Sequence, residues 1–273
     1  SSPPYTTTSA AGDPAVGREE EYKQFDREIE AMGVRLKDAN TVKVRDDVFD
    51  EVTLMALYKL VHKKLLTAIG GPISTGKEAN VFYGERDGQG LAIKIYRIQT
   101  ANFKAMNEYL AGDRRFSSVR GTRKALIFAW TKKEYSNLAR AHEAQIPVPE
   151  PLAFDRNILL MGFLGQDEVP YPQLRNAAVE DYGAVYRDIL DYIKRLYQEA
   201  RLVHADLSEY NILYHEKPYL IDMGQAVTLD HPRASAFLVR DIKNLNRYFS
   251  HHCDVPEEQE IVRAIVGTGR REI

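Results

Sequence analysis

The chain has 273 residues, and its 44% hydrophobic content suits one large domain or two lobes around a cleft. Its 37 Lys and Arg against 39 Asp and Glu give a net charge of −2, which argues against general attraction to DNA or to an anionic membrane. The single Cys253 allows no internal disulfide, and no apolar run approaches the roughly 20 residues that span a bilayer. We therefore expect a cytoplasmic protein that binds neither membrane nor DNA.

The first part of the chain is expected to contribute little to a core. Residues 1–17 are small, polar and rich in proline, which predicts a disordered tail. Residues 18–49 carry mixed charge and are expected to form a peripheral segment. Apolar side chains then recur with the helical period over residues 50–67, which predicts a helix that ends before the Gly-Gly-Pro run at 70–72.

The periodicity then changes to the alternation typical of strands. Residues 81–85 and 91–96 alternate around a turn that contains Asp-Gly, which predicts a hairpin. Residues 97–124 are polar and basic, and are expected to form a flexible insertion. A third strand is predicted at 125–130, followed by a helix at 131–144.

The second half of the chain reads as mostly helical. An extended linker at 146–151 and a strand at 157–163 are expected to precede it. Helices are predicted at 179–201, 232–250 and 256–266. A strand-rich half followed by a helix-rich half predicts an α+β fold with two lobes and a hinge near 162–165. We place the N-terminal lobe at 50–162 and the C-terminal lobe at 163–273.

One constellation carries most of the chemical information. Asp206 and Asn211 stand at the two ends of one short loop, and Asp222 closes a strand further on. A kinase uses such a set to orient an attacking hydroxyl with the first Asp, and to hold a divalent cation with the Asn and the second Asp. Taken singly, Asp206 could instead be a loop residue that caps the next turn, Asn211 a turn residue, and Asp222 a strand-end residue that forms an Asx-turn. Their combination favours the catalytic interpretation.

A lysine inside an apolar strand is the second candidate. Lys94 stands in the run Ala-Ile-Lys-Ile-Tyr, where its ammonium is costly unless it meets an anion such as a nucleotide phosphate. A glutamate is expected to brace it, and Glu134 is favoured over Glu108, which lies in the polar insertion. Glu134 also fits a capping box that begins at Thr131, and both roles remain open. An edge-strand Lys facing solvent is the alternative for Lys94.

The segment before the first predicted strand is a candidate nucleotide loop. It is Ser-Thr-Gly-Lys-Glu-Ala-Asn-Val-Phe over 74–82, and it contains neither a Walker motif nor the three-glycine loop of ordinary protein kinases. Its main-chain N–H groups, together with Ser74 and Lys77, are candidates to cover phosphates. A plain turn is the competing interpretation.

The polar insertion carries a group of basic residues that could contact an RNA backbone or lie on a solvated loop. They accompany Phe116, and they are Arg114, Arg115, Arg120, Arg123 and Lys124. Ser117 and Ser118, in the same stretch, are candidate autophosphorylation sites.

Together these motifs resemble the RIO family of atypical serine/threonine kinases, in its type-one branch. The resemblance covers roughly residues 45–255. It rests on His-Ala-Asp-Leu-Ser-Glu-Tyr-Asn at 204–211, Ile-Asp-Met-Gly-Gln at 221–225, the loop at 74–82, Trp130 through Leu138, and Val-Pro-Glu-Pro at 148–151.

The resemblance implies a reduced two-lobe kinase fold, with a truncated helical C-lobe and an extra N-terminal helix at 50–67. It implies ATP and Mg²⁺, or Mn²⁺, as cofactors, with Asp206 as the proton acceptor and Asn211 and Asp222 as metal ligands. It further implies an aspartyl-phosphate on Asp222 and adenine contacts with the hinge backbone at Met161, Gly162 and Leu164. Its implied role is maturation of the small ribosomal subunit, in contact with that precursor and its rRNA.

Departures from ordinary protein kinases leave alternatives open. Met223 replaces the usual Phe, Ser208 stands where many protein kinases have Lys, and no Ala-Pro-Glu follows Asp222. A peptide substrate therefore has no obvious platform, so an ATPase or autophosphorylating enzyme is favoured. The alternatives are a protein serine kinase acting in trans, a small-molecule kinase of the aminoglycoside or choline type, and a non-catalytic binding module. Gly162 stands where type-one relatives often carry an acidic residue, and this could soften nucleotide selectivity.

Overall fold

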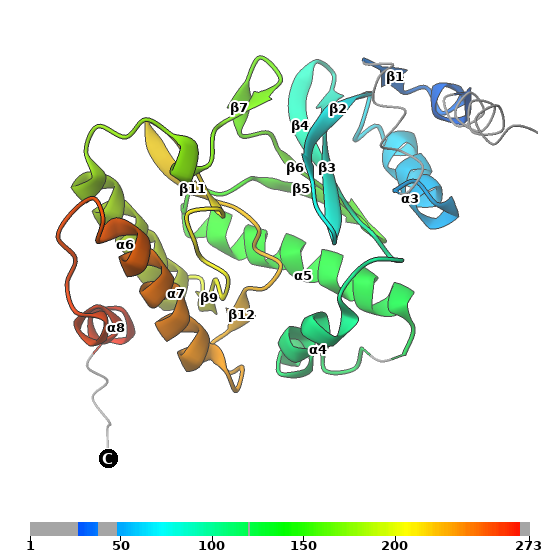
Figure 1. Cartoon of the computed structure of the whole chain (residues 1–273). Helices are drawn as coiled ribbons and strands as arrows, with labels where there is room; N and C mark the ends of the chain where they lie inside the picture. The colour runs from blue at the N-terminus through cyan, green and yellow to red at the C-terminus, as the bar shows by residue number, and fades with distance from the viewer. Residues whose placement is uncertain (1–26, 38–47, 120, 268–273) are drawn as a thin grey trace, which may run out of the picture.

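The computed structural model describes residues 27–37, 48–119 and 121–267, and it places a twisted sheet beside a group of helices (Figure 1). The predicted tail at 1–17, most of the peripheral segment at 18–49 and Arg120 lie outside the described residues. No helix in the described ranges is long and apolar enough to cross a membrane.

Six strands form the main sheet, in the order β1-β2-β3-β4-β6-β5. All neighbours are antiparallel except β1 and β2, which run parallel. The strands are β1 (Arg35–Leu36), β2 (Ala68–Thr75), β3 (Ala79–Arg86), β4 (Gln89–Tyr96), β5 (Pro151–Asp155) and β6 (Ile158–Gly162). β2 and β5 were missing from the prediction, since 70–72 read as a helix stop and 146–151 as a linker.

The predicted hairpin is confirmed as β3 and β4, with Arg86 paired to Gln89. The two residues between them, Asp87 and Gly88, have φ of 50° and 82°. A two-residue turn with both central φ angles positive matches the right-handed twist of the flanking strands, and Asp-Gly is a preferred sequence for it. The turn thus fixes the register that places Lys94 opposite Val81, near the end of β4.

Helix α3 (Glu51–His62) covers one face of the sheet and confirms the predicted N-terminal helix, although it is shorter than 50–67. Asp50 begins it, because its carboxylate accepts a hydrogen bond of 2.9 Å from Thr53 N. Its buried Leu57 and Leu60 belong to one apolar cluster with Phe82 and other sheet residues.

The predicted third strand at 125–130 is wrong, because these residues lie inside helix α5 (Arg123–Glu143). Their unbroken apolar run has no alternation, and the apolar residues also fit the i, i+3, i+4 spacing of a buried helix. The capping box is wrong for the same reason. The N-cap is Thr122, which accepts from Ala125 N, whereas Thr131 is in mid-helix and donates to the Ile127 carbonyl.

The segment 97–124, predicted to be a flexible insertion, contains regular structure instead. It includes helix α4 (Phe103–Ala111) and a 3₁₀ turn, η2 (Arg114–Phe116). Met106, Leu110 and Phe116 are buried in an apolar cluster with residues of α5. The small apolar stripe of α4 was hidden among its polar residues.

The helical half confirms the three predicted C-terminal helices within a few residues at each end. They are α6 (Tyr182–Gln198), α7 (Ala234–Phe249) and α8 (Glu258–Val266). Short strand pairs and a 3₁₀ turn accompany them, namely β7 (Gly165–Gln166) with β8 (Val169–Pro170), η3 (Leu174–Asn176), β9 (Leu202–Val203) with β12 (Val227–Thr228), and β10 (Ile212–His215) with β11 (Lys217–Leu220). Helix α5 lies between the sheet and this half (Figure 1).

Candidate functional site

A cavity of about 410 Å³ lies between the sheet and the helical half. Its lining includes these residues predicted from the sequence: Ser74, Lys94, Glu134, Met161, Gly162, Leu164, Asn211 and Asp222. A second cavity of about 280 Å³ continues under the loop between β2 and β3, and Lys77 and Asp206 line it together with Asp222. The structure therefore brings the predicted residues from both halves to one cleft.

Lys94 lies at the centre of a charged network. Its Nζ is 2.7 Å from Glu134 Oε1 and 3.0 Å from Asp222 Oδ1, and Tyr96 OH donates to Glu134 at 2.7 Å. Burial lowers the pKa of Lys94, but the Glu134 carboxylate and its other anionic neighbours outweigh it, so the pKa is raised well above its ordinary value. The amine is therefore a fixed positive charge inside the cleft.

Glu134 is the residue that contacts Lys94, and Glu108 does not. The Glu108 carboxylate instead lies 3.3 Å from the Arg233 guanidinium, where both side chains are about half-exposed. The geometry thus selects Glu134 as the partner of Lys94, although Glu134 lies in the middle of α5 and not in the predicted capping box.

Asp206 and Asn211 contact each other across their loop. The Asn211 amide nitrogen donates to the Asp206 main-chain carbonyl at 2.7 Å and to its Oδ2 at 3.1 Å. Since the nitrogen is engaged in this way, the amide oxygen is the Asn211 atom that remains to coordinate a cation. Burial, together with the Asp222 charge, raises the pKa of Asp206. A carboxylate with a raised pKa is suited to accept a proton.

Asp241 positions this loop, and the sequence analysis missed it. Its buried carboxylate on α7 accepts hydrogen bonds from Ala205 N at 2.8 Å and from Leu207 N at 3.0 Å. Ala205 has φ of 70°, so the loop needs such support on both sides of Asp206. The sequence signal that could have identified Asp241 is an acidic residue on the apolar face of a predicted helix, next to Ile242.

His204 lies beneath the same loop. Its Nδ1 accepts from Asp206 N at 3.2 Å, so its Nε2 carries the hydrogen and donates to the Ile221 carbonyl at 2.9 Å. This bond joins the Asp206 loop to the residue that precedes Asp222.

Asp222 also has a left-handed backbone, with φ of 55°. Burial alone would raise its pKa, but the Lys94 ammonium holds that pKa below its ordinary value. An ionised carboxylate and a neutral amide oxygen, from Asp222 and Asn211, are hard oxygen ligands of the kind Mg²⁺ prefers. The described residues contain no group of three or more His, Cys, Asp or Glu that would hold a metal. With two protein oxygen ligands, such an ion would take its further ligands from water or a phosphate.

The hinge backbone is partly engaged within the protein. Gly162 N donates to the Glu150 carbonyl at 2.8 Å, and the Leu164 carbonyl accepts from Tyr171 N at 2.9 Å. Among the hydrogen bonds between main-chain groups outside helices and strands, none in the described residues has the Leu164 N–H as its donor. Met161 lies in β6, where it pairs with Ala92.

The proposed phosphate-covering residues sit at the cleft edge. Ser74 lies in β2, paired with Val81, instead of in a loop. Lys77 is exposed in the β2–β3 turn, and Thr100 donates to its carbonyl at 2.6 Å.

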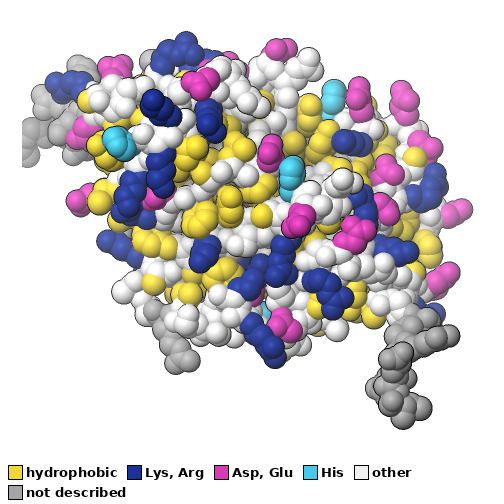
Figure 2. Space-filling view, turned by 180° about the vertical axis from the view of Figure 1, so that it is seen from behind, with side chains coloured by type: hydrophobic (Ala, Val, Ile, Leu, Met, Phe, Trp, Pro, Cys, Tyr) yellow, Lys and Arg dark blue, Asp and Glu magenta, His cyan; other side chains and the backbone are white. Residues whose placement is uncertain are grey.

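Several side chains of the basic group predicted to contact RNA instead contact other residues of the chain. Arg114 lies 3.2 Å from Asp230, Arg115 is 2.7 Å from Asp113, and Arg123 stacks on the Phe103 ring at 4.6 Å. Lys124 is exposed. On the face shown in Figure 2, both signs of charge are interspersed, without a single continuous basic field.

Lys133, next to Glu134, leads to a pH prediction. Burial lowers its pKa to about 7 from 10.5, and the nearby Asp113 charge offsets only part of this effect. Between these pH values the unfolded chain binds more protons than the folded one, so the free energy of unfolding should rise as pH rises from about 7 to 10.5. Lys133→Met should flatten that rise in urea denaturation, whereas Lys132→Met at an exposed position should keep it. Equal slopes in wild type and Lys133→Met would contradict it.

Comparisons with known proteins give a consistent result. A family model described as the RIO domain matches residues 80–261. The "RIO-type serine/threonine-protein kinase Rio1" of Haloferax volcanii is 44% identical over 229 residues, which cover 83% of this chain and 79% of that protein. The protein of the same name from Methanocaldococcus jannaschii is 39% identical, with 85% and 80% covered.

Two further comparisons extend this picture. The human "Serine/threonine-protein kinase RIO1" is 40% identical over 232 residues, but this chain spans only 41% of its length. Among solved structures, the ADP/Mg²⁺-phosphoaspartate complex of the Rio2 kinase from Chaetomium thermophilum matches with a TM-score of 0.64 at 24% identity. That match covers 91% of this chain and 76% of the solved chain.

Proposed function

The chain belongs to the RIO family, in its Rio1 branch, and on this basis we propose that it is an atypical serine/threonine kinase that binds ATP with Mg²⁺. It autophosphorylates, hydrolyses ATP, or does both. Mn²⁺ is an alternative cation. The observation that carries the proposal is the convergence of Lys94, Asp206, Asn211 and Asp222 on one cleft between the two halves.

Each of these residues has a role that its contacts support. Lys94, braced by Glu134, neutralises phosphate oxygens, and Asn211 with Asp222 holds the cation. The cation would supply charge neutralisation on the phosphates. The apolar wall of the cavity receives the adenine, and the Leu164 N–H lies at its hinge side. Ser74, near the end of β2, and Lys77, in the β2–β3 turn, close over the phosphates.

Phosphate transfer proceeds through Asp222. A carboxylate oxygen of Asp222 attacks the γ-phosphorus, the bond from that phosphorus to the β–γ bridging oxygen breaks, and ADP leaves with the electron pair. Water then attacks the acyl phosphate and releases inorganic phosphate, while Asp206 accepts the water proton. The Rio2 structure similar to this chain is a phosphoaspartate complex, which supports an acyl phosphate in the fold.

The proposed setting is maturation of the small ribosomal subunit, with the precursor particle and its rRNA as partners. The exposed part of the basic group on 114–124 offers a contact for RNA phosphates. We expect a cytoplasmic location and no membrane or DNA partner.

ATP turnover measured with and without purified small-subunit precursor tests this function. A switch that is controlled by the particle predicts that turnover rises when the precursor is added, and that mature subunits have a smaller effect. Acid-stable phosphoserine that accumulates on a separate protein at high turnover would instead establish a kinase acting in trans. Absence of any Mg²⁺-dependent nucleotide binding would contradict the proposed function altogether.

A further inference from the structure

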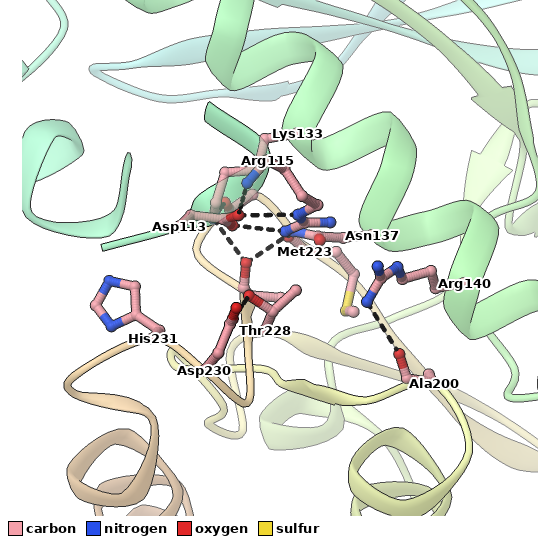
Figure 3. A network of polar contacts seen from close by, with 12 residues as sticks. Asp113, Arg115, Lys133, Asn137, Arg140, Ala200, Met223, Thr228, Asp230 and His231 are labelled. Carbon is pink, nitrogen blue, oxygen red and sulfur yellow. Dashed lines mark hydrogen bonds and ion pairs between the residues drawn. The ribbon is translucent and has the colours of Figure 1, made fainter. Parts of the chain in front are cut away.

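The main chain that follows Asp222 is bound to helix α5 by two buried side chains. Lys133 Nζ donates to the carbonyls of Gly224 and Ala226, each at 2.6 Å. Asn137 Nδ2 donates to the carbonyls of Met223 and Ala226 at 2.8 and 2.9 Å. Figure 3 shows both side chains reaching from α5 toward the segment that carries Met223. Four hydrogen bonds thus hold residues 223–226.

These two side chains are fully buried, with an exposed fraction of 0% for each. An amine taken out of water is costly unless its hydrogen bonds replace those it loses. Both 2.6 Å bonds of Lys133 go to main-chain carbonyls, and the Trp130 ring lies 4.9 Å from its Nζ. The hydrogen-bonding capacity of this buried lysine is therefore used to hold the main chain of residues 223–226 in place.

The same face of α5 also holds the Lys94 network. Trp130, Lys133, Glu134 and Asn137 follow the i, i+3, i+4, i+7 spacing of one helical face. A Cβ added at Gly224 would lie 2.7 Å from Trp130 Nε1, so the segment packs directly on that face. The left-handed backbone of Asp222 is strained for a residue with a side chain, and it needs such surroundings to persist.

We propose that Lys133 and Asn137 are positioning residues that fix residues 223–226 on α5, so that the Asp222 carboxylate stays aimed at the cation site. Helix α5 then carries the Glu134 contact to Lys94 and the anchor of the metal carboxylate as one rigid unit. This inference rests on the proposed function, because it gives Asp222 the metal role. Loss of these hydrogen bonds would release the Asp222 segment from α5 while the Lys94–Glu134 pair stays in place.

The test uses isosteric variants that remove the donors. Lys133→Met and Asn137→Leu are compared singly and together with wild type, and Lys132→Met, one residue away and exposed, is the matched control. The affinity for a non-hydrolysable ATP analogue is measured twice for each protein, with excess EDTA and with Mg²⁺. Thermal unfolding of each variant checks that it is folded.

Each single variant is expected to lose about tenfold or more of the gain in affinity that Mg²⁺ provides. Lys133→Met leaves the Gly224 carbonyl without its lysine donor, and Asn137→Leu removes one donor each from the Met223 and Ala226 carbonyls. Affinity in EDTA should stay within about twofold of wild type, since the Lys94–Glu134 pair is untouched. The double variant should lose more than either single one, because Ala226 then has neither donor. Lys132→Met should behave as wild type.

Two results would overturn the positioning role. One is an unchanged Mg²⁺ gain in folded Lys133→Met and Asn137→Leu. The other is an equal loss of affinity with and without Mg²⁺, which indicates general damage to the cleft. If Lys133→Met does not fold, Asn137→Leu alone decides between these outcomes. Wild type without any Mg²⁺ gain would instead contradict the proposed function, so the two failures are distinguishable.

Discussion

Asp222→Asn is expected to abolish the acyl-phosphate signal and to lower ATP turnover at least about a thousandfold. The amide keeps the size of the side chain, but it is not a nucleophile and it removes the negative charge that lies 3.0 Å from Lys94. The measurement is incubation with γ-labelled ATP, followed by hydroxylamine treatment of the denatured protein. Wild type should carry label that hydroxylamine releases, and the variant should carry none.

The control for this variant is Asp191→Asn on α6, where the carboxylate is 58% exposed and pairs with Arg195 on the same helix. That variant should retain the label and the turnover of wild type. Hydroxylamine-labile label that persists in Asp222→Asn would contradict the assignment of the phosphorylated residue. Loss of label in both variants would indicate a general effect of charge removal.

Asp206→Asn should separate turnover from phosphate transfer to the protein. Asp206 does not form the acyl phosphate in the proposed scheme, but it accepts the proton of the attacking water or hydroxyl. Turnover is therefore expected to fall by about 10² to 10⁴ while roughly stoichiometric hydroxylamine-labile label accumulates. Affinity for Mg²⁺ and nucleotide should change little, because Asn211 and Asp222 remain.

A rapid-quench time course measures both quantities in one experiment. The variant should show a burst of labelled protein followed by very slow release of phosphate. A variant that turns over ATP at the wild-type rate would contradict the proton-acceptor role. A variant that neither binds nucleotide nor forms label would show that Asp206 is needed for nucleotide binding, before the hydrolysis step to which the scheme assigns it.

The sequence predicted the site more completely than the fold around it. Asp206, Asn211 and Asp222 lie close in the chain and follow a spacing with a chemical meaning, so their meeting in one cleft was expected. Lys94 was found because an ammonium inside an apolar strand needs an anion. The predicted α+β, kinase-like fold agrees with the solved Rio2 structures, which match this chain with TM-scores of 0.64 and 0.62.

Sequence periodicity predicted the wrong element where tertiary packing decides between helix and strand. The run at 125–130 is apolar on all sides because α5 is buried between the two halves, and a buried helix segment has the same composition as a buried strand. Strand β2 contains the run Gly-Gly-Pro at 70–72, which is typical of a turn, yet the strand pairs with β3. Such pairing depends on partners that sequence periodicity does not show.

The supporting residues of the site were missed for a related reason. Asp241, Lys133 and Asn137 act on main-chain groups far away in the sequence, and no short motif joins them to their targets. The one visible signal is a polar side chain on an otherwise apolar helical face. This signal marks a residue that deserves inspection, but it does not identify what the residue contacts.

The central claim is that a divalent cation and a triphosphate are held between the two halves by Asn211 and Asp222. The most direct measurement is a crystal structure with a non-hydrolysable ATP analogue and Mn²⁺, in which anomalous scattering locates the metal. We predict an anomalous peak within coordination distance of the Asn211 amide oxygen and an Asp222 carboxylate oxygen, with phosphate oxygens as further ligands. A nucleotide in the cleft whose metal lies away from both side chains, or a cleft that stays empty at saturating nucleotide and Mn²⁺, would contradict it.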